Sequence, residues 1–120
     1  MRMGHSGNLS RCDLTRTGAC LAIAGEIDED SASPLVERAA AAIGGGVTRL
    51  DLSGVTFFSA AGVRVLVLLG GSAEAEHVVV RVTCSMIVWR ILELCGIRQV
   101  TGLLLEPPTR RADPAARPGR

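Results

Sequence analysis

Hydrophobic and polar residues follow two different spacings along the chain, and the changes between them mark the expected elements. Residues 19–27 form a mostly apolar run of strand length, and the short run 12–15 is expected to pair with it as an edge strand. Residues 47–52 and 78–82 have the same short, aliphatic character. A last short strand is expected within residues 100–105.

The first helix is expected to begin at Pro34, because a proline in the first helical turn loses no hydrogen bond. Ser31 or Ser33 is its predicted N-cap, and the glycine run at residues 44–46 ends it. Between these points apolar residues recur at helical spacing, namely Leu35, Val36, Ala39, Ala42 and Ile43.

Two more helices are expected further along. Residues 53–58 are expected to connect the preceding strand to a helix over residues 60–73. The glycine pair at 70–71 is a possible earlier end of this helix, because glycine disfavours helix. Ser85 is a favoured N-cap for the third helix, and Gly96 is placed to end it. The third helix carries one wide apolar face, made of Ile87, Val88, Ile91, Leu92, Leu94 and Cys95.

Strands that alternate with helices imply parallel crossovers. The sequence therefore predicts an α/β fold in a single domain, with a mixed, mostly parallel sheet of four to five strands and helices packed on it. A core of Ala, Val, Leu and Ile suits strands that are buried on both faces. The domain is expected over residues 12–106, between a disordered N-terminus at 1–11 and a disordered Pro/Arg-rich tail at 107–120.

Composition and charge exclude several classes of protein. The 120 residues are enough for one domain, and 13 basic and 12 acidic residues give a formal net charge of +1. That balance argues against nucleic-acid binding, which needs a concentrated basic surface. Neither a signal peptide nor a membrane-spanning run is apparent, so a soluble, cytoplasmic protein without a membrane partner is expected.

Residues that could carry out chemistry are sparse. The two histidines stand apart from the four cysteines and no CxxC pair occurs, so no metal site, cofactor or catalytic group is expected. Cys20, Cys84 and Cys95 lie in apolar runs and are expected to be buried. Cys12 is expected to be the most accessible of the four.

Four segments carry a further signal. They are residues 25–28 (Gly-Glu-Ile-Asp), 51–57, 61–66 and 85–97. In this order and with this spacing they resemble the STAS domain of bacterial anti-sigma factor antagonists. The resemblance extends over residues 12–106.

The resemblance implies a STAS-like fold and a protein-binding role without catalysis. Proteins of this family bind a switch kinase that is also an anti-sigma factor, and by occupying it they free a sigma factor. In regulated members the kinase phosphorylates a serine at the start of the second helix, within an Asp-Ser-Ser-Gly motif. The phosphorylated protein then dissociates.

At that place the present chain reads Ser59-Ala60-Ala61-Gly62. Gly62 matches the family's glycine, but Ala61 stands where the acceptor serine would be and Ser59 where the aspartate would be. Alanine has no hydroxyl group, so the usual phosphorylation is not expected at this position. Ser59 is a candidate displaced phosphoacceptor, with a helix N-cap as the competing role.

The resemblance implies a partner-binding surface made of Asp28, Phe58, Ser59, Ala60, Ala61, Gly62 and Arg64. Asp28 matches the family's aspartate near the partner-facing loops, and a plain turn aspartate is an equally good interpretation. Phe57 and Phe58 point to opposite faces of an extended segment, so one is expected in the core and the other beside the second helix. Trp89 is either a core-rim residue or an interface anchor.

Two interpretations of function remain open. In the first, the chain is an antagonist-like protein that binds a serine-kinase-type anti-sigma factor without the usual phosphoacceptor. In the second, it is a non-phosphorylated scaffold subunit of a STAS-containing signalling assembly, with a homo-oligomer as one form of it. A small-ligand sensor or an enzyme is a weaker third interpretation. The sequence also leaves open whether Ser53 or Thr56 serves as a phosphoacceptor instead.

Overall fold

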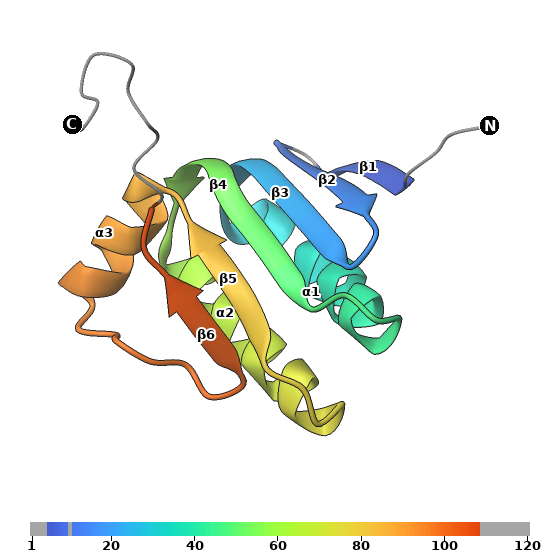
Figure 1. Ribbon diagram of the computed structural model, residues 1–120. Helices are drawn as coiled ribbons and strands as arrows, with labels where there is room; N and C mark the ends of the chain where they lie inside the picture. The colour runs from blue at the N-terminus through green and yellow to red at the C-terminus, as the bar shows by residue number, and fades with distance from the viewer. Residues whose placement is uncertain (1–4, 10, 109–120) are drawn as a thin grey trace, which may run out of the picture.

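The computed structural model describes residues 5–9 and 11–108. Its elements in chain order are β1 (His5–Leu9), β2 (Cys12–Thr17), β3 (Cys20–Ile27), α1 (Glu29–Gly44), β4 (Arg49–Phe58), α2 (Ala60–Ala75), β5 (Val80–Cys84), α3 (Met86–Leu94) and β6 (Leu103–Glu106). The six strands form one sheet in which neighbours in space follow one another in the chain, from β1 at one edge to β6 at the other (Figure 1).

Pairing in this sheet is mixed. Strand β2 is antiparallel to both of its neighbours, β1 and β3, and β3, β4, β5 and β6 run parallel. The predicted mixed, mostly parallel α/β sheet is therefore confirmed, with one more strand than expected. The expected pairing of residues 12–15 with 19–27 is present as the β2–β3 ladder.

The additional strand is β1, which lies in the segment expected to be a disordered N-terminus. Residues 5–9 pair with residues 12–16 in an antiparallel register. Backbone hydrogen bonds form this ladder, and they do not need the apolar side chains on which the sequence prediction relied. At the other end of the chain, residues 107–108 follow β6 without regular structure, and residues 109–120 of the predicted tail lie outside the described part.

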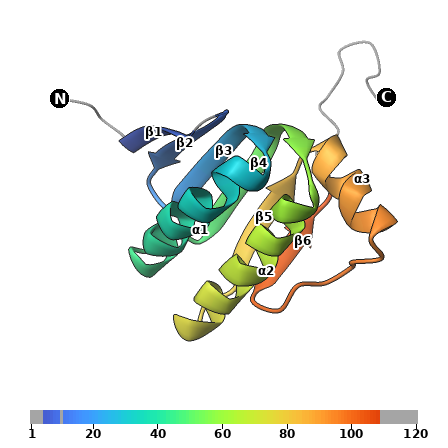
Figure 2. The same ribbon diagram turned by 180° about the vertical axis from the view of Figure 1, so that it is seen from behind.

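The helices lie on one side of the sheet (Figure 2). Connections between parallel strands are almost always right-handed, so parallel strands laid down in order across a sheet place every crossover helix on the same side. Here α1 and α2 lie side by side against the sheet, and α3 lies at the end of β5. The expectation of strands buried on both faces is therefore wrong, because strand order leaves the second face without helices.

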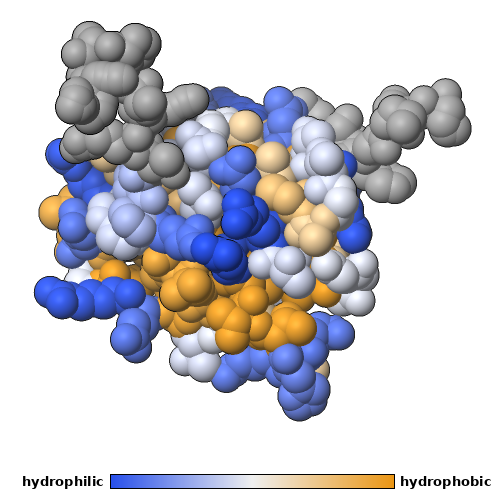
Figure 3. Space-filling view, in the orientation of Figure 1, coloured by the Kyte–Doolittle hydropathy of each residue, from blue (hydrophilic) through white to orange (hydrophobic). Residues whose placement is uncertain are grey.

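The uncovered face of the sheet is largely polar. Along β5, for example, Val80 and Val82 point into the core and are fully buried, whereas Arg81 between them is exposed. Figure 3 shows hydrophilic side chains across the middle of this face and an apolar patch towards the end where β4, β5 and β6 begin. Arg81 pairs with Glu106 on the neighbouring strand through a 2.7 Å contact.

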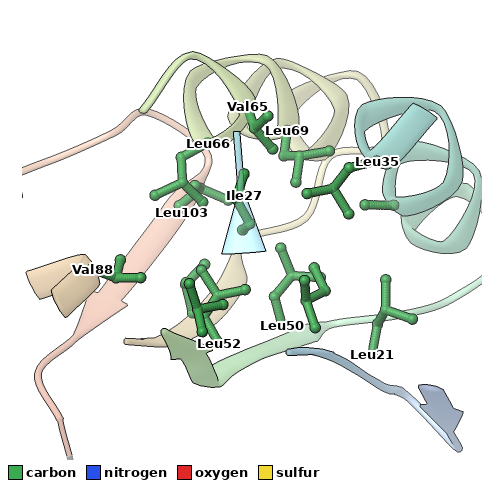
Figure 4. Packing of buried hydrophobic residues seen from close by; sticks show 14 of the residues in the cluster. Leu21, Ile27, Leu35, Leu50, Leu52, Val65, Leu66, Leu69, Val88 and Leu103 are labelled. Atoms are coloured by element: carbon green, nitrogen blue, oxygen red, sulfur yellow. The ribbon is translucent and has the colours of Figure 1, made fainter. Parts of the chain in front are cut away.

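The core lies between the sheet and the helices (Figure 4). The largest of its fully buried side chains are Ile23, Ile27, Leu35, Leu50, Leu52, Leu66, Leu69, Leu92, Val47, Val80, Val82 and Val88. Burying a leucine or valine side chain contributes roughly 1.5–3 kcal/mol, so this aliphatic cluster stabilises the arrangement of α1 and α2 on the sheet.

Helix α1 begins five residues earlier than the proline predicts. Its N-cap is Asp28, and Pro34 lies inside the helix. Proline at the sixth helical position removes one hydrogen bond, to the carbonyl of Asp30, at a cost of roughly 3 kcal/mol that other contacts of the helix must offset. The capping box of Asp28 and Ser31 supplies the bonds that fix the earlier start.

Helix α2 does not end at its glycine pair. Gly70 is buried, and a Cβ at this position would collide with the backbone carbonyl oxygen of Thr101. A close approach of the chain after α3 therefore explains this glycine, and α2 continues to Ala75.

Helix α3 has the predicted Ser85 N-cap, and its chain turns at Gly96, whose φ of 72° favours glycine. Its apolar face is narrower than predicted, since Leu94 and Cys95 are exposed. The helix has only nine residues and lies beyond the sheet, so only Val88 and Leu92 are fully covered. No helix in the described part of the chain has the length and apolar character needed to cross a membrane.

Two of the cysteine expectations are wrong. Cys95 is exposed, although it was expected to be buried. Cys12 is fully buried, although it was expected to be the most accessible, because the second strand points it into the core beside Leu14. Cys84 is buried as expected, and Cys20 is intermediate.

Candidate functional site

Two neighbouring strands end side by side where α1 and α2 begin. Ile27, the last residue of β3, pairs with Phe58, the last residue of β4. The next residue in each segment, Asp28 or Ser59, is a helix N-cap. The register of one strand pair therefore brings the two helix N-termini together at one end of the sheet.

Asp28 is held by its own helix. Its carboxylate accepts a hydrogen bond from the backbone N–H of Ser31 at 3.1 Å, and its backbone N–H donates to the Ser31 hydroxyl oxygen at 3.1 Å. The backbone N–H of Ser31 is the main cause that lowers the pKa of Asp28 below its usual value of 3.8, with the Ser31 hydroxyl and Arg11 acting in the same direction. Asp28 is thus a fixed negative charge at neutral pH.

Ser59 is the N-cap of α2, which is one of the two roles predicted for it, the other being a phosphoacceptor. Its hydroxyl oxygen accepts a hydrogen bond from the backbone N–H of Ala61 at 3.1 Å. The same hydroxyl group donates to the carbonyl oxygen of Ile27 at 3.4 Å. The hydroxyl group therefore donates one hydrogen bond and accepts another within the protein, and the side chain is half-buried.

The next three residues divide between surface and core. Ala60 is exposed, whereas Ala61 is fully buried and Gly62 is buried. A Cβ on Gly62 would lie 2.5 Å from the ring of Phe58, so the glycine is needed for α2 to pack on this ring. Of these three residues, which were predicted to lie on the partner-binding surface, only Ala60 exposes a side chain to solvent.

The two phenylalanines occupy the opposite roles to those assigned. Phe58 is 3% exposed and belongs to the core, and Phe57 is 48% exposed. The placement of Phe58 on the partner-binding surface is therefore wrong. Strand β4 has two extra residues relative to β3, one between Asp51 and Gly54 and one at Thr56, and the two shifts together leave Phe58 facing the core.

Arg64 lies on the exposed side of α2 and links the two helices. Its guanidinium group donates to both carboxylate oxygens of Glu29, each at 3.3 Å. A second exposed pair, Arg11 with Glu26 at 3.1 Å, lies at the end of β3. With Asp28 and the exposed Asp30, the strand ends present four carboxylates and two guanidinium groups, so this end of the molecule is acidic.

A shallow groove continues from this site between the two helices. Its volume is about 250 Å³, and its lining includes Ala32, Val36, Ala61, Arg64, Val65 and Leu68. The methyl group of Ala61 forms part of the inner wall, where it closes the space between α1 and α2. A residue with a charged group at this position would have to displace that packing.

We define the candidate partner site as Asp28, Glu29, Phe57, Ala60 and Arg64. Asp28, Ala60 and Arg64 were predicted, whereas Phe57 and Glu29 were not assigned to the site. Alternation counted along β4 from Leu50 and from Val55 gives opposite answers, because the strand has two extra residues relative to β3, so the sequence does not show which phenylalanine is exposed. The acidic run at residues 28–30 was the only available signal for Glu29.

Other predicted residues lie away from this site. Trp89 is half-buried and packs against the core, which agrees with its core-rim interpretation, and it lines a hollow of about 550 Å³ with Leu92, Ile97 and Leu105. His77 is exposed in the turn after α2. Within residues 11–108, no group of three or more His, Cys, Asp or Glu side chains is arranged to hold a metal ion.

Comparisons with known proteins find a matching family and solved structures with a similar fold. A family model described as "Mlab, STAS domain" matches residues 11–106. A crystal structure of an anti-sigma factor antagonist from Mycobacterium paratuberculosis is similar with a TM-score of 0.57 and 20% sequence identity, covering 90% of this chain and 86% of that chain. At that identity the likeness shows the fold alone. A search of curated proteins found no match.

Proposed function

The chain belongs to the STAS domain family, and from that premise we propose that it is a cytoplasmic anti-sigma factor antagonist. In this role it binds a serine-kinase-type anti-sigma factor and thereby frees a sigma factor. It acts by binding alone, without catalysis. The observation that supports this most is the pairing of Ile27 with Phe58, which brings Asp28 close to the start of α2, where Ala60 and Arg64 are exposed.

The same geometry supports a protein whose binding is not controlled by phosphorylation at the start of α2. The acceptor position is occupied by Ala61, which has no hydroxyl group and is fully buried. The nearest hydroxyl group, on Ser59, is engaged in the cap of α2. A phosphate would add about 1.5–2 negative charges to a surface that is already acidic, and without it the surface keeps one charge state.

A direct test uses a charge at the exposed alanine. Ala60→Glu places a carboxylate in the first turn of α2, where the helix dipole favours it, so the protein is expected to fold normally. Binding to a cognate kinase-type anti-sigma factor, measured by calorimetry, is expected to weaken by about tenfold or more. The matched control is Ala41→Glu, on an exposed position at the other end of α1, which is expected to leave binding unchanged.

Incubation with the kinase and ATP tests the missing switch. Mass spectrometry is expected to find no phosphate on residues 59–62, nor on Ser53 or Thr56. Phosphate on Ser59, Ser53 or Thr56, the three of these positions that have a hydroxyl group, would contradict an unswitched binder. Equal binding by wild type and Ala60→Glu would show that the partner uses another surface.

A scaffold subunit of a larger STAS-containing assembly is the second candidate. The buried Ala61 favours it as well, because such a subunit needs no release step. Co-purification with other STAS proteins, together with no affinity for a kinase-type anti-sigma factor, would favour this candidate over the first.

A further inference from the structure

The outward side of α2 is apolar and uncovered. The exposed residues on this side of the helix are Ala60, Arg64, Val67, Leu68, Gly71, Glu74 and Ala75. Val67 and Leu68 are each 52% exposed, and no charged residue occurs between Arg64 and Glu74. Figure 2 shows no other element over this side of α2. A surface helix normally presents polar residues outward, so α2 has the outward surface of a helix that contacts a partner.

Gly71 is the residue on this side that the isolated fold does not explain. A Cβ at Gly71 would meet nothing within 4 Å, in contrast to Gly62 and Gly70 on the same helix. Glycine lowers helix stability relative to alanine, so its presence costs stability without a packing reason inside the chain. It lies at a hollow of about 360 Å³ between this side of α2, at Val67 and Glu74, and residues 97–101 of the chain after α3.

The positions on this side of α2 are self-complementary. Val67 and Gly71 lie two residues before and after position 69, and Arg64 and Glu74 lie five residues before and after it. An antiparallel copy of the helix, related by a two-fold axis at position 69, would bring Val67 over the partner's Gly71. The same axis would bring Arg64 to the partner's Glu74, and both pairs occur twice.

We infer that α2 is a self-association surface, whose partner is the antiparallel α2 of a second copy of this chain. The valine side chain fills the space above the glycine, which lets the helix backbones approach closely. The opposite charges at the two ends select the antiparallel direction and this register. One two-fold contact of this kind is closed, so the product is a dimer rather than a chain of copies.

The dimer and the candidate partner site share Arg64. If the proposed function holds, dimerisation and anti-sigma factor binding therefore exclude one another, and self-association limits the amount of free antagonist. The dimer itself does not depend on that function. Its test uses the purified chain alone, so its failure is distinguishable from failure of the proposed function.

Sedimentation over a concentration series measures the association directly. The mass of the full chain is expected to rise with concentration from 12.5 kDa towards twice that value. Gly71→Gln fills the space above the helix, is expected to keep the fold because its Cβ meets nothing within 4 Å, and is expected to raise the dimer dissociation constant by about tenfold.

Charge exchange tests the antiparallel register. Arg64→Glu and Glu74→Arg are each expected to weaken the dimer, and the double variant Arg64→Glu/Glu74→Arg is expected to restore it to within about threefold of wild type. The matched control is Glu76→Arg, an exposed charge reversal off this side of α2, which is expected to change nothing. A monomer at every concentration, or a double variant no better than the single ones, would overturn the inference.

Discussion

Arg64 on α2 donates to both carboxylate oxygens of Glu29 on α1, each at 3.3 Å. The two residues are 35 positions apart, and the pairing of β3 with β4 brings their helices together. Both side chains are more than half exposed, so the contact contributes little to folding. It does place a guanidinium group beside Ala60, at the start of the helix on which the proposed partner docks.

Arg64→Ala is therefore expected to separate stability from binding. The free energy of unfolding should change by less than about 1 kcal/mol, because an exposed ion pair is largely screened by water. Affinity for the anti-sigma factor should fall by about tenfold if the guanidinium contacts the partner. Arg38→Ala on the exposed side of α1 is the matched control, and an equal loss of affinity in both variants would contradict a specific role for Arg64.

Three glycines of α2 are expected to respond differently to alanine. Gly62→Ala should destabilise the protein by about 1–3 kcal/mol, because the new methyl group meets the ring of Phe58. Gly70→Ala should cost at least as much, because the obstacle is the rigid backbone of Thr101. Gly71→Ala should instead stabilise by about 0.4–1 kcal/mol, since the space there is free.

Urea unfolding of the three variants, at a concentration where the chain is monomeric, checks this order. A destabilising Gly71→Ala would show that the glycine is needed inside the isolated chain. That result would also remove the packing argument for α2 as a surface that contacts a second copy.

The order of helices and strands was largely predictable from the sequence, whereas the burial of each face of the sheet was not. Hydrophobic spacing located the elements from β2 to β6, and Ser59 and Ser85 are caps as their side chains suggested. The order of strands across the sheet is a long-range property, so the uncovered second face was not visible in any local pattern. The early start of α1 was missed because Pro34 suggested a start that the Asp28–Ser31 capping box overrides.

The cap at Asp28 has a definite pH dependence. Its pKa is lower in the folded protein, so the charged cap stabilises the fold above the unfolded pKa, and this contribution is lost as pH falls through the lower folded pKa. The thermal unfolding midpoint of Asp28→Ala is therefore expected to lie below wild type at pH 7, with the gap closing towards pH 2. Asp28→Asn retains an N-cap oxygen and should lose less at pH 7. A gap that stays constant with pH would contradict a role for the charge.

Cysteine reactivity is expected to follow the structure rather than the local sequence. Burial raises the pKa of Cys12 and of Cys84 to about 11, and both thiols are inaccessible. Cys95 is exposed, so iodoacetamide at pH 8 should alkylate Cys95 first, as read by peptide mass spectrometry. Cys12 and Cys84 should react only after unfolding in urea. Early labelling of Cys12 would mean that β2 does not hold it in the core.

The site itself was only partly predictable, because β4 does not alternate regularly. It has two extra residues relative to β3, one between Asp51 and Gly54 and one at Thr56. Alternation counted from Leu50 would bury Phe58, whereas alternation counted from Val55 would bury Phe57. The two shifts cancel, so that Phe58 enters the core and Phe57 faces outward. Nothing in the local composition marks the shifts, since they depend on pairing with β3.

The two adjacent phenylalanines therefore form a matched pair of variants for the candidate site. Phe58→Ala is expected to lose about 3–5 kcal/mol of stability, because it removes a buried ring. Phe57→Ala should change stability by about 0.5 kcal/mol or less. It should nevertheless weaken anti-sigma factor binding by about tenfold or more, as expected of an exposed aromatic anchor. Thermal unfolding and calorimetry on the same samples separate the two effects. A Phe57→Ala variant that binds as well as wild type would exclude this ring from the site and leave Ala60 and Arg64 as its centre.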